Sequence, residues 1–371
     1  MRIRRLTLRN YRNHEKTEMF FHPSLNIMVG DNGEGKTNII ESIYYLATGR
    51  SHRSSKDNDI VNWDSPFFSI YGEIEIRTRC LTFEVLYERN GKKRIKVNNK
   101  EIQKLSELIG KFNTVIFSPE TINIVRGAPQ ERRRYLDFAA SQASSQYFYY
   151  LQHYHHVLTQ RNHLLKNLLD KKGSEETLQI WNEQLVTTGT EVIQRRVSLI
   201  KKIQALCLPF HQSLTDQEES LGIEYQSSIG SSDKMTGKED IQEVFKEKLI
   251  KNERIDKKRG YTTVGPHRDD ILLVANGMDI RNYGSQGQQR TAALSLKLGE
   301  KELIESEKGE KPVLLLDDVM SELDNQRRKF LLKILDGSFQ SFITTTNLNS
   351  LENSQTQDHY TFNVKNGQAQ R

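Results

Sequence analysis

The stretch Gly30-Asp31-Asn32-Gly33-Glu34-Gly35-Lys36-Thr37 decides the fold, because it matches the pattern GxxxxGK[ST]. It follows an alternating apolar run, Leu25–Val29, and precedes a helical run, Asn38–Leu46, so strand, loop and helix stand in the required order. Glycines let the backbone curl until successive N–H groups point at one anion. We therefore predict that the whole loop, together with Asn38 at the helix start, binds the phosphates of a nucleotide.

Two residues of this loop have separate chemical tasks. Lys36 is expected to reach the β- and γ-phosphates of ATP, and Thr37 is expected to offer its hydroxyl to Mg²⁺. The partial positive charge at the N-terminus of the following helix adds to the attraction for phosphate. ATP and Mg²⁺ are the cofactors that the sequence predicts, and an unrelated glycine-rich turn is the alternative.

A phosphate loop also needs a carboxylate that holds Mg²⁺. The apolar run Val313–Leu316 is followed directly by Asp317 and Asp318. We expect Asp317 to hold Mg²⁺ through water, and Asp318 to polarise the attacking water as the catalytic residue. Taken alone, the run would equally suit a buried strand that ends in a turn. Because the loop and the acidic strand lie near opposite ends of the sequence, both ends must build one sheet.

Composition indicates a globular, mildly basic chain. The 371 residues include 54 Lys and Arg against 48 Asp and Glu, a net charge of +6. This surplus favours a polyanion such as nucleic acid, although a generic basic protein explains it equally well. Cys80 and Cys207 have no metal or disulfide spacing, which suits a reducing cytoplasm. No apolar run approaches the roughly 18 residues of a membrane span, so no membrane contact is expected.

Periodicity divides the chain into three parts. Residues 1–125 alternate as strands, with a hairpin signal at Asn90-Gly91. Residues 126–261 contain two long helices, expected to pair antiparallel across a break at 172–174, followed by a polar region with one strand near 221–225. Residues 262–371 return to an α/β pattern. We predict an α/β fold in which 1–125 and 262–371 form a phosphate-loop core plus an antiparallel β subdomain, and 126–261 forms a helical insertion lobe.

A polar turn, Gly284–Arg290, precedes the helix expected before the acidic strand, and such a turn is a second anion site. The order of phosphate loop, helical insertion, this turn, the acidic strand and then Ser321–Asp324 resembles the ATP-binding-cassette (ABC) ATPase heads. In that family the corresponding turn of one subunit contacts the γ-phosphate held by its partner. The resemblance implies that Ser285, Gly287 and Gln288 bind the nucleotide of a second copy, giving an ATP-dependent homodimer. It also implies that Arg12, after the first strand, approaches the phosphates, with an ordinary surface arginine as the alternative.

Within that class the motifs resemble the RecF family of bacterial recombination and replication-repair proteins. The matching segments are Leu6–Asn13, Gly30–Asn38, Thr48–Ser51, Phe117–Glu120, Gly127–Pro129, Arg132–Arg134, Leu136-Asp137, Gly265–Asp269, Ser285–Thr291 and Leu316–Asp318. The resemblance implies that the ATP-bound dimer binds double-stranded DNA near single-strand gaps. It further implies that the dimer helps to load recombinase with RecO and RecR, and that weak, DNA-stimulated ATP hydrolysis releases it.

Several positions depart from the wider ABC class. Gln286 stands where many members have a second glycine, and Asp318 replaces the usual catalytic Glu. The last predicted strand, Phe342–Thr346, ends in Thr346-Asn347, where transporters carry a switch His. The usual glutamine loop has no plain equivalent. These departures predict slow hydrolysis that acts as a timer.

Other functions make different demands on the sequence. A transporter motor would need the switch His and a shorter helical lobe, and a metabolic kinase would leave the turn at 284–290 unexplained. An SMC-like tether would need a coiled coil hundreds of residues long. An ABC-type ATPase subunit of another assembly remains the alternative.

Two charged clusters have no assigned role. Arg132–Arg134 lies at a helix start, where cations are unfavourable, so a phosphate or an acidic partner is expected there, with a solvated face as the alternative. Lys251–Arg259 is rich in cations, but Glu253 and Asp256 interrupt it, so the segment is a weak candidate for polyanion binding.

Overall fold

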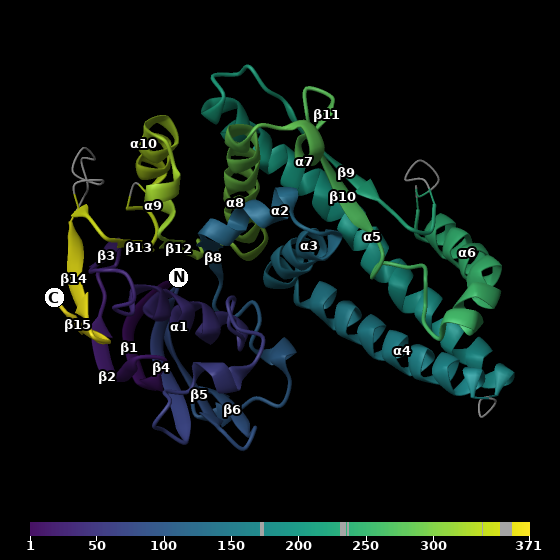
Figure 1. Ribbon diagram of the computed structural model, residues 1–371, viewed down its shortest axis with the longest axis horizontal. Coiled ribbons are helices and arrows are strands. Elements are labelled where there is room, and N and C mark those ends of the chain that lie inside the picture. Colours follow the sequence, from purple (N-terminus) through teal and green to yellow (C-terminus); the bar gives the residue numbers. More distant parts are fainter. Residues whose placement is uncertain (171–173, 231–234, 236, 336, 349–357) are drawn as a thin grey trace. The chain divides into compact units, whose positions relative to one another are not determined.

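The computed structural model describes residues 1–170, 174–230, 235, 237–335, 337–348 and 358–371. These form two compact units, 1–121 with 300–371, and 122–299 (Figure 1). The expected boundaries at 125 and 262 differ from this division, most of all at the second. The chain from 262 to 299 belongs to the second unit because its strand β10 (Asp270–Ala275) pairs along its whole length with β9 (Leu221–Gln226).

The first unit contains the six-stranded sheet that carries the phosphate loop. Its strand order is β15-β14-β3-β13-β12-β8. The bounds are β3 Leu25–Val29, β8 Thr114–Phe117, β12 Val313–Asp317, β13 Ser341–Thr345, β14 His359–Lys365 and β15 Gln368–Gln370. All neighbours are parallel except β14 and β15. The carboxyl ends of β3 and β12 therefore meet at one edge, so both chain ends build one sheet, as the sequence predicts.

A second sheet in the same unit is antiparallel, with the order β2-β1-β4-β5-β6-β7. The bounds are β1 Arg2–Tyr11, β2 His14–Phe20, β4 Phe67–Ile76, β5 Arg79–Glu88, β6 Lys93–Val97 and β7 Lys100–Glu101. The predicted hairpin is confirmed, since Gly91 takes a φ of 88° between the paired strands β5 and β6. Helix α1 (Lys36–Thr48) contacts strands of both sheets and buries Ile39, Ile40 and Ile43 completely.

Short elements complete the first unit. They are 3-10 helices at Asp57–Ile60, Leu105–Glu107 and Pro119–Ile122, and α-helices α9 Val319–Glu322 and α10 Asn325–Ile334. Helix α8 (Gln286–Lys308) begins in the second unit, and its residues from Glu300 onward count with the first. The strand pair β14–β15 was not predicted, because its residues are largely polar and mostly exposed or half-exposed.

The second unit is mainly helical. Its elements are α2 Asn123–Arg126, α3 Pro129–Ala143, α4 Ser145–Leu169, α5 Glu175–Leu214, α6 Lys238–Arg259, β9, β10, β11 Met278–Asp279, α7 Ile280–Tyr283 and the start of α8. Helices α4 and α5 form the predicted antiparallel pair (Figure 1). Of the predicted break at 172–174, the first two residues lie outside the described residues.

Helix α6 is the main element of this unit that sequence analysis missed. It packs on α4 and α5 through Ile241, Phe245 and Leu249, which repeat every fourth residue. Gly189 of α5 allows the close contact, because a Cβ there would lie 2.4 Å from a ring carbon of Phe245. Among the described residues, no helix is long and apolar enough to cross a bilayer.

Candidate nucleotide site

The phosphate loop joins β3 to α1 and holds its lysine tightly. The Lys36 ammonium donates to the carbonyl oxygens of Gly30 at 2.6 Å and Asp31 at 2.8 Å. Its side chain is buried, and this burial lowers the pKa of Lys36, against the opposing charges of Asp318, Asp31 and Asp317. A lysine ammonium held inside a glycine-rich loop at the start of a helix is suited to the terminal phosphates of a nucleotide.

Glycine is required at two positions of this loop for steric reasons. Gly35 has a φ of 114°, and a Cβ there would lie 2.8 Å from Asn13 Oδ1 and 2.9 Å from His14 Nε2. A Cβ on Gly30 would lie 2.2 Å from the carbonyl oxygen of Val364. The β1–β2 turn and strand β14 therefore pack directly against the loop and fix its backbone path.

The β1–β2 hairpin supports one side of the loop. Asn13 donates to the carbonyl oxygen of Glu34 at 3.0 Å and accepts from Asn38 at 2.8 Å. His14 Nε2 lies 3.1 Å from the carbonyl oxygen of Gly35. His14 is fully buried, and this burial lowers its pKa. Asn38, predicted as a nucleotide contact, thus has its amide engaged with the hairpin.

The C-terminal hairpin supports the other side, which sequence analysis missed. The amide of Gly367 donates to the carbonyl oxygen of Glu34 at 3.0 Å, and the amide of Asn366 donates to its carboxylate. Gly367 has a φ of 71°, and a Cβ there would lie 2.0 Å from the carbonyl oxygen of Asn13. The signal was present in the sequence, because Asn366-Gly367 is a typical two-residue hairpin turn between short alternating strands.

The acidic strand end meets the loop as expected. Thr37 Oγ1 donates to Asp317 Oδ1 at 2.8 Å, and Thr344 Oγ1 donates to the same oxygen at 2.9 Å. Asp317 is 5% exposed. Burial raises the pKa of Asp317, and the hydrogen bonds from Thr37 and Thr344 oppose this rise. A buried carboxylate beside a hydroxyl is an oxygen donor pair of the kind that Mg²⁺ takes alongside nucleotide phosphates and water, so the residues fit that ion.

Asp318 follows in a special backbone conformation. Its φ of 51° lies in the left-handed region, and it is the N-cap residue directly before helix α9. Its amide donates to Thr344 Oγ1 at 2.8 Å, while its carboxylate accepts from the Ser321 hydroxyl at 3.1 Å. Among the nearby carboxylates, Asp318 has the largest effect on the pKa of Lys36, and its negative charge raises that pKa. Strand β13 thus positions both acids through one threonine whose role the sequence did not reveal.

Arg12 is held by helix α1. Its guanidinium makes two hydrogen bonds to Glu41, at 2.9 and 2.7 Å, and further bonds to Ser54 Oγ and the Asp59 carbonyl oxygen. Glu41 is fully buried; burial alone would raise its pKa, but the Arg12 contacts and the Ser51 hydroxyl bring it below its usual value. The phosphate contact expected for Arg12 stays a prediction. To make that contact, the Arg12 guanidinium would have to leave the Glu41 carboxylate.

The polar turn lies in the second unit, at the start of α8. The amide of Ser285 donates to Gln288 Oε1 at 2.8 Å, and the amide of Gln288 donates to Ser285 Oγ at 3.2 Å. This reciprocal pair is a helix capping box. Gln288 also donates to Glu219 at 2.8 Å. Ser285 is exposed and Gly287 half-exposed, so the N-terminus of this helix is accessible to solvent.

The arginine run at the start of α3 has partners within its own unit. Arg132 is buried and pairs with both carboxylate oxygens of Asp270, at 2.7 and 2.8 Å. Arg133 donates to the carbonyl oxygen of Asp269 at 2.7 Å. Of the two partners considered for this run, the acidic one is therefore present for Arg132. In the part of the chain that the structure describes, no cluster of three or more His, Cys, Asp or Glu side chains could hold a metal ion.

Together, the parallel sheet, the glycine loop, the paired acids and the antiparallel subdomain define an ABC-type ATPase head with a helical insertion. A family model described as the RecF/RecN/SMC N terminal domain matches residues 2–369. A protein named DNA replication and repair protein RecF, from Bacillus thuringiensis (strain Al Hakam), is 43% identical over 368 residues, covering 99% of this chain and 98% of its own.

Solved structures agree. A structure of the recombination mediator protein RecF-ATP in the RecFOR pathway has a TM-score of 0.92 and 39% identity, covering 100% of this chain and 97% of its own. The Smc head domain of Pyrococcus furiosus, covering 100% of this chain and 95% of its own, has a TM-score of 0.56 at 15% identity, a likeness in fold alone. The chain belongs to the RecF family of DNA replication and repair proteins.

Proposed function

We propose that this chain is an ATP-dependent DNA-binding protein of recombinational repair and replication restart, acting in the cytoplasm. Two copies joined by ATP bind double-stranded DNA near single-strand gaps. The observation that carries the proposal is the 2.8 Å contact between Thr37 and Asp317, which brings a phosphate-loop hydroxyl and a buried carboxylate together from opposite ends of the sequence. A site of this kind has one well-attested use, the binding of a nucleoside triphosphate.

Each residue of the site then has a defined task. Backbone amides of Gly30–Thr37 surround the phosphates, and the Lys36 ammonium turns from the carbonyl oxygens of Gly30 and Asp31 to the β- and γ-phosphates. Thr37 and Asp317 would hold Mg²⁺, which supplies charge neutralisation at the phosphates. The hairpins at Asn13 and Gly367 keep the loop in shape while Lys36 changes partners.

The site is completed by a second copy. Ser285, Gly287 and Gln288 sit at an exposed helix N-terminus, which is a suitable donor for the γ-phosphate held by the partner's loop. Asp318 orients the attacking water. Its carboxylate is one methylene shorter than the usual Glu and is engaged by Ser321, which supports slow, DNA-stimulated hydrolysis. Slow hydrolysis would time the release of the dimer from DNA.

The pathway partners follow from the relatives. The solved relative is described as a recombination mediator in the RecFOR pathway. We therefore propose that RecR and RecO cooperate with the DNA-bound dimer and that the assembly helps to load recombinase. The chain would mark the gap boundary, because phosphate contacts give duplex affinity with little base specificity.

The decisive experiment is fluorescence anisotropy of a labelled gapped duplex titrated with the protein in ATP and, separately, in ADP. Tight, salt-sensitive binding in ATP alone supports the proposal. Lys36→Ala is expected to abolish both ATP-dependent dimerisation, measured by light scattering, and the ATP-dependent gain in DNA affinity. Equal binding in both nucleotides would mean that DNA binding does not depend on ATP. That result would favour an ATPase subunit of another assembly.

A further inference from the structure

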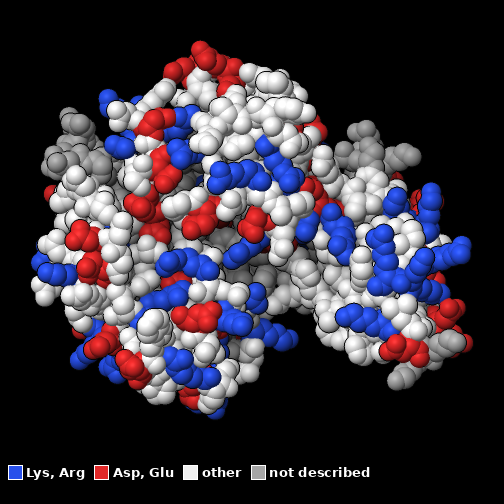
Figure 2. Space-filling view, viewed as in Figure 1, with Lys and Arg blue, Asp and Glu red and all other residues white. Residues whose placement is uncertain are grey.

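Helix α6 of the second unit presents a cationic face to solvent. Five exposed cations lie on two adjacent rows of the helix surface, with Lys246, Arg254 and Lys258 on one row and Lys251 and Arg259 on the other. Along the helix they cover about 20 Å, at roughly 1.5 Å per residue. Lys and Arg side chains gather visibly over α6 in Figure 2. Within this face, Glu247 near its start is the one acid.

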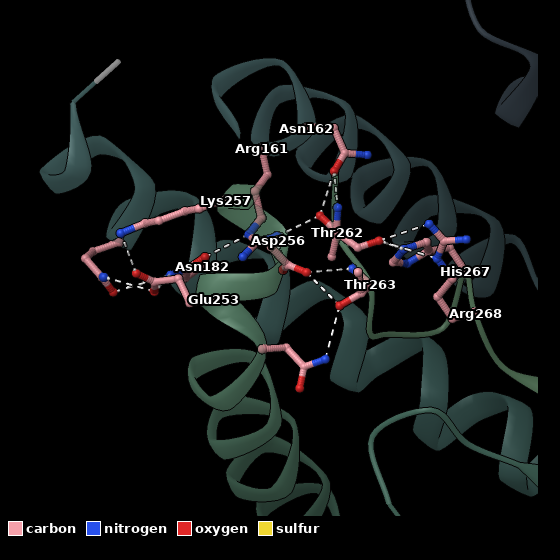
Figure 3. Close-up of polar contacts among 12 residues, drawn as sticks. Arg161, Asn162, Asn182, Glu253, Asp256, Lys257, Thr262, Thr263, His267 and Arg268 are labelled. Carbon is pink, nitrogen blue, oxygen red and sulfur yellow. Dashed lines mark hydrogen bonds and ion pairs between the residues drawn. The ribbon is translucent and has the colours of Figure 1, made fainter. Parts of the chain in front are cut away.

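The two acids that interrupt this segment in sequence lie on the other side of the helix. Asp256 is fully buried and pairs with the buried Arg161 of α4 at 2.9 Å. Glu253 is engaged by Lys257 at 3.0 Å and by Asn182 of α5 at 3.2 Å. Figure 3 shows these contacts converging between the helices. The face opposite them is therefore far more cationic than the sequence of the segment suggests.

The buried contacts also fix the orientation of the helix. Arg161 bonds to Asn182 of α5 and to Thr262, the residue that follows the end of α6 by a short turn, while Asp256 accepts from Thr263 (Figure 3). Such a network cannot rotate without leaving buried charge unpaired. The backbone of helix α6 is thus held in one orientation before any ligand binds. This preorganisation lowers the entropic cost of binding a ligand through the outer side chains.

Within the described part of the chain, the cations of this face are free of ion pairs. Among the described residues, none of Lys246, Lys251, Arg254, Lys258 and Arg259 makes an ion pair, whereas the neighbouring Lys257 makes two. Favourable placement at the helix C-terminus explains Lys258 and Arg259 only, because that effect fades within one turn. Arg254 and Lys258 are four residues apart, and like charges at that spacing repel each other by about 0.2–0.5 kcal/mol per pair.

A polyanion fits this face better than a protein does. Three of the five cations are lysines, which are depleted at the centres of protein interfaces. Ile250 and Ile255 are exposed between them, but two separate side chains do not make the apolar centre of a protein interface. A DNA backbone carries about one charge per 1.7 Å of duplex, dense enough to engage cations that lie about 6 to 12 Å apart along each row.

We propose that the outer face of α6 is a phosphate-backbone contact for duplex DNA, with Lys251, Arg254 and Lys258 at its centre. The inference rests on the proposed function and locates part of its DNA surface on the helical lobe. Contacts of this kind fix the position of the protein on the duplex without reading bases.

The test uses the full chain with ATP and a labelled gapped duplex, at several salt concentrations between about 50 and 200 mM. The variant is Lys251→Gln/Arg254→Gln/Lys258→Gln, because glutamine keeps helix propensity close to that of lysine and arginine. Three lost phosphate contacts are expected to reduce the slope of log affinity against log salt by about 2 to 3, and to weaken binding at least about tenfold at low salt.

The control variant is Lys100→Gln/Lys104→Gln/Lys111→Gln, which removes the same charge from three exposed lysines of the first unit. It is expected to keep a slope close to that of the wild type, and both variants should still dimerise in ATP. An unchanged slope in the α6 variant, or an equal loss of slope and affinity in the control, overturns the inference. The cationic face would then be better explained as a binding surface for a protein partner. Failure of the wild-type protein to bind the duplex in ATP would instead refute the proposed function.

Discussion

Replacing Arg161 by methionine should destabilise the helical unit strongly. The side chains of Arg161 and Asp256 are both 0% exposed, and Arg161 Nη1 lies 2.9 Å from the carboxylate. Methionine preserves much of the length and apolar contact of the arginine stem. The Asp256 carboxylate would keep only its hydrogen bonds from Thr263. Breaking a buried pair in this way costs about 3–5 kcal/mol of unfolding free energy, because a charge stays buried without a counterion.

A second variant separates the loss of pairing from the loss of packing. Asp256→Asn removes the charge but keeps an oxygen that accepts from the Thr263 amide. Arg161→Met/Asp256→Asn should therefore be more stable than Arg161→Met alone, by roughly 0.5–3 kcal/mol of coupling energy. Lys257→Met is the matched control on the same helix, since its pairs with Glu175 and Glu253 are partly exposed and contribute about 1 kcal/mol or less.

Tryptophan fluorescence during urea unfolding reports this unit selectively. Trp181 lies in α5, next to Asn182 of the network, whereas Trp63 is 93% exposed and its emission should change little on unfolding. A Trp181 transition shifted no more by Arg161→Met than by Lys257→Met would contradict the cost assigned to the buried pair. A double variant less stable than Arg161→Met would contradict it as well.

Three further predictions concern other regions. Gly367→Ala should weaken ATP binding about tenfold in a calorimetric titration, because its Cβ would meet the Asn13 carbonyl oxygen at 2.0 Å and displace the hairpin from Glu34. Gly277→Ala, with a φ of 80° but open space around its Cβ, should leave binding unchanged. Asp318→Asn should keep ATP binding but slow phosphate release and prolong the ATP-bound dimer; faster turnover would contradict its assigned role. A thiol reagent at about pH 8 should label Cys80 rapidly and Cys207 only after unfolding, since burial raises the pKa of Cys207 to about 12 and mass spectrometry resolves the two sites.

The nucleotide site could be predicted where the chemistry is local or fixed by sheet topology. The phosphate loop is a continuous motif, and parallel pairing leaves β3 and β12 few ways to end except at one edge. The role of Thr344 could not be predicted in the same way. Strand β13 ends in consecutive threonines, and only the observed register, which sets Thr344 opposite Asp317, identifies the one that serves both acids.

The contacts that hold the phosphate loop and Arg12 in place could not be predicted from the sequence, for a different reason. Glu34 meets Gly367, and Arg12 meets Glu41, across separations that no periodicity describes. Polar strands such as β14 show only a weak alternation of apolar residues in the sequence. Their stability comes from backbone pairing, here with β3 and β15. A resemblance based on motifs shows which residues take part in a site, but it does not show which distant segments hold them.

Helix α6 shows why charge must be judged by helix face. The sequence of Lys251–Arg259 alternates cations with acids, and this mixture argued against a polyanion site. A helix turns about 100° per residue, so acids placed near every third or fourth position collect on one side. Here that side is the interior, where Asp256 is neutralised by Arg161. The net charge of +6 therefore understates the local field, because the cations on the outer face lie away from Asp256, which is buried, and from Glu253, which pairs with Lys257.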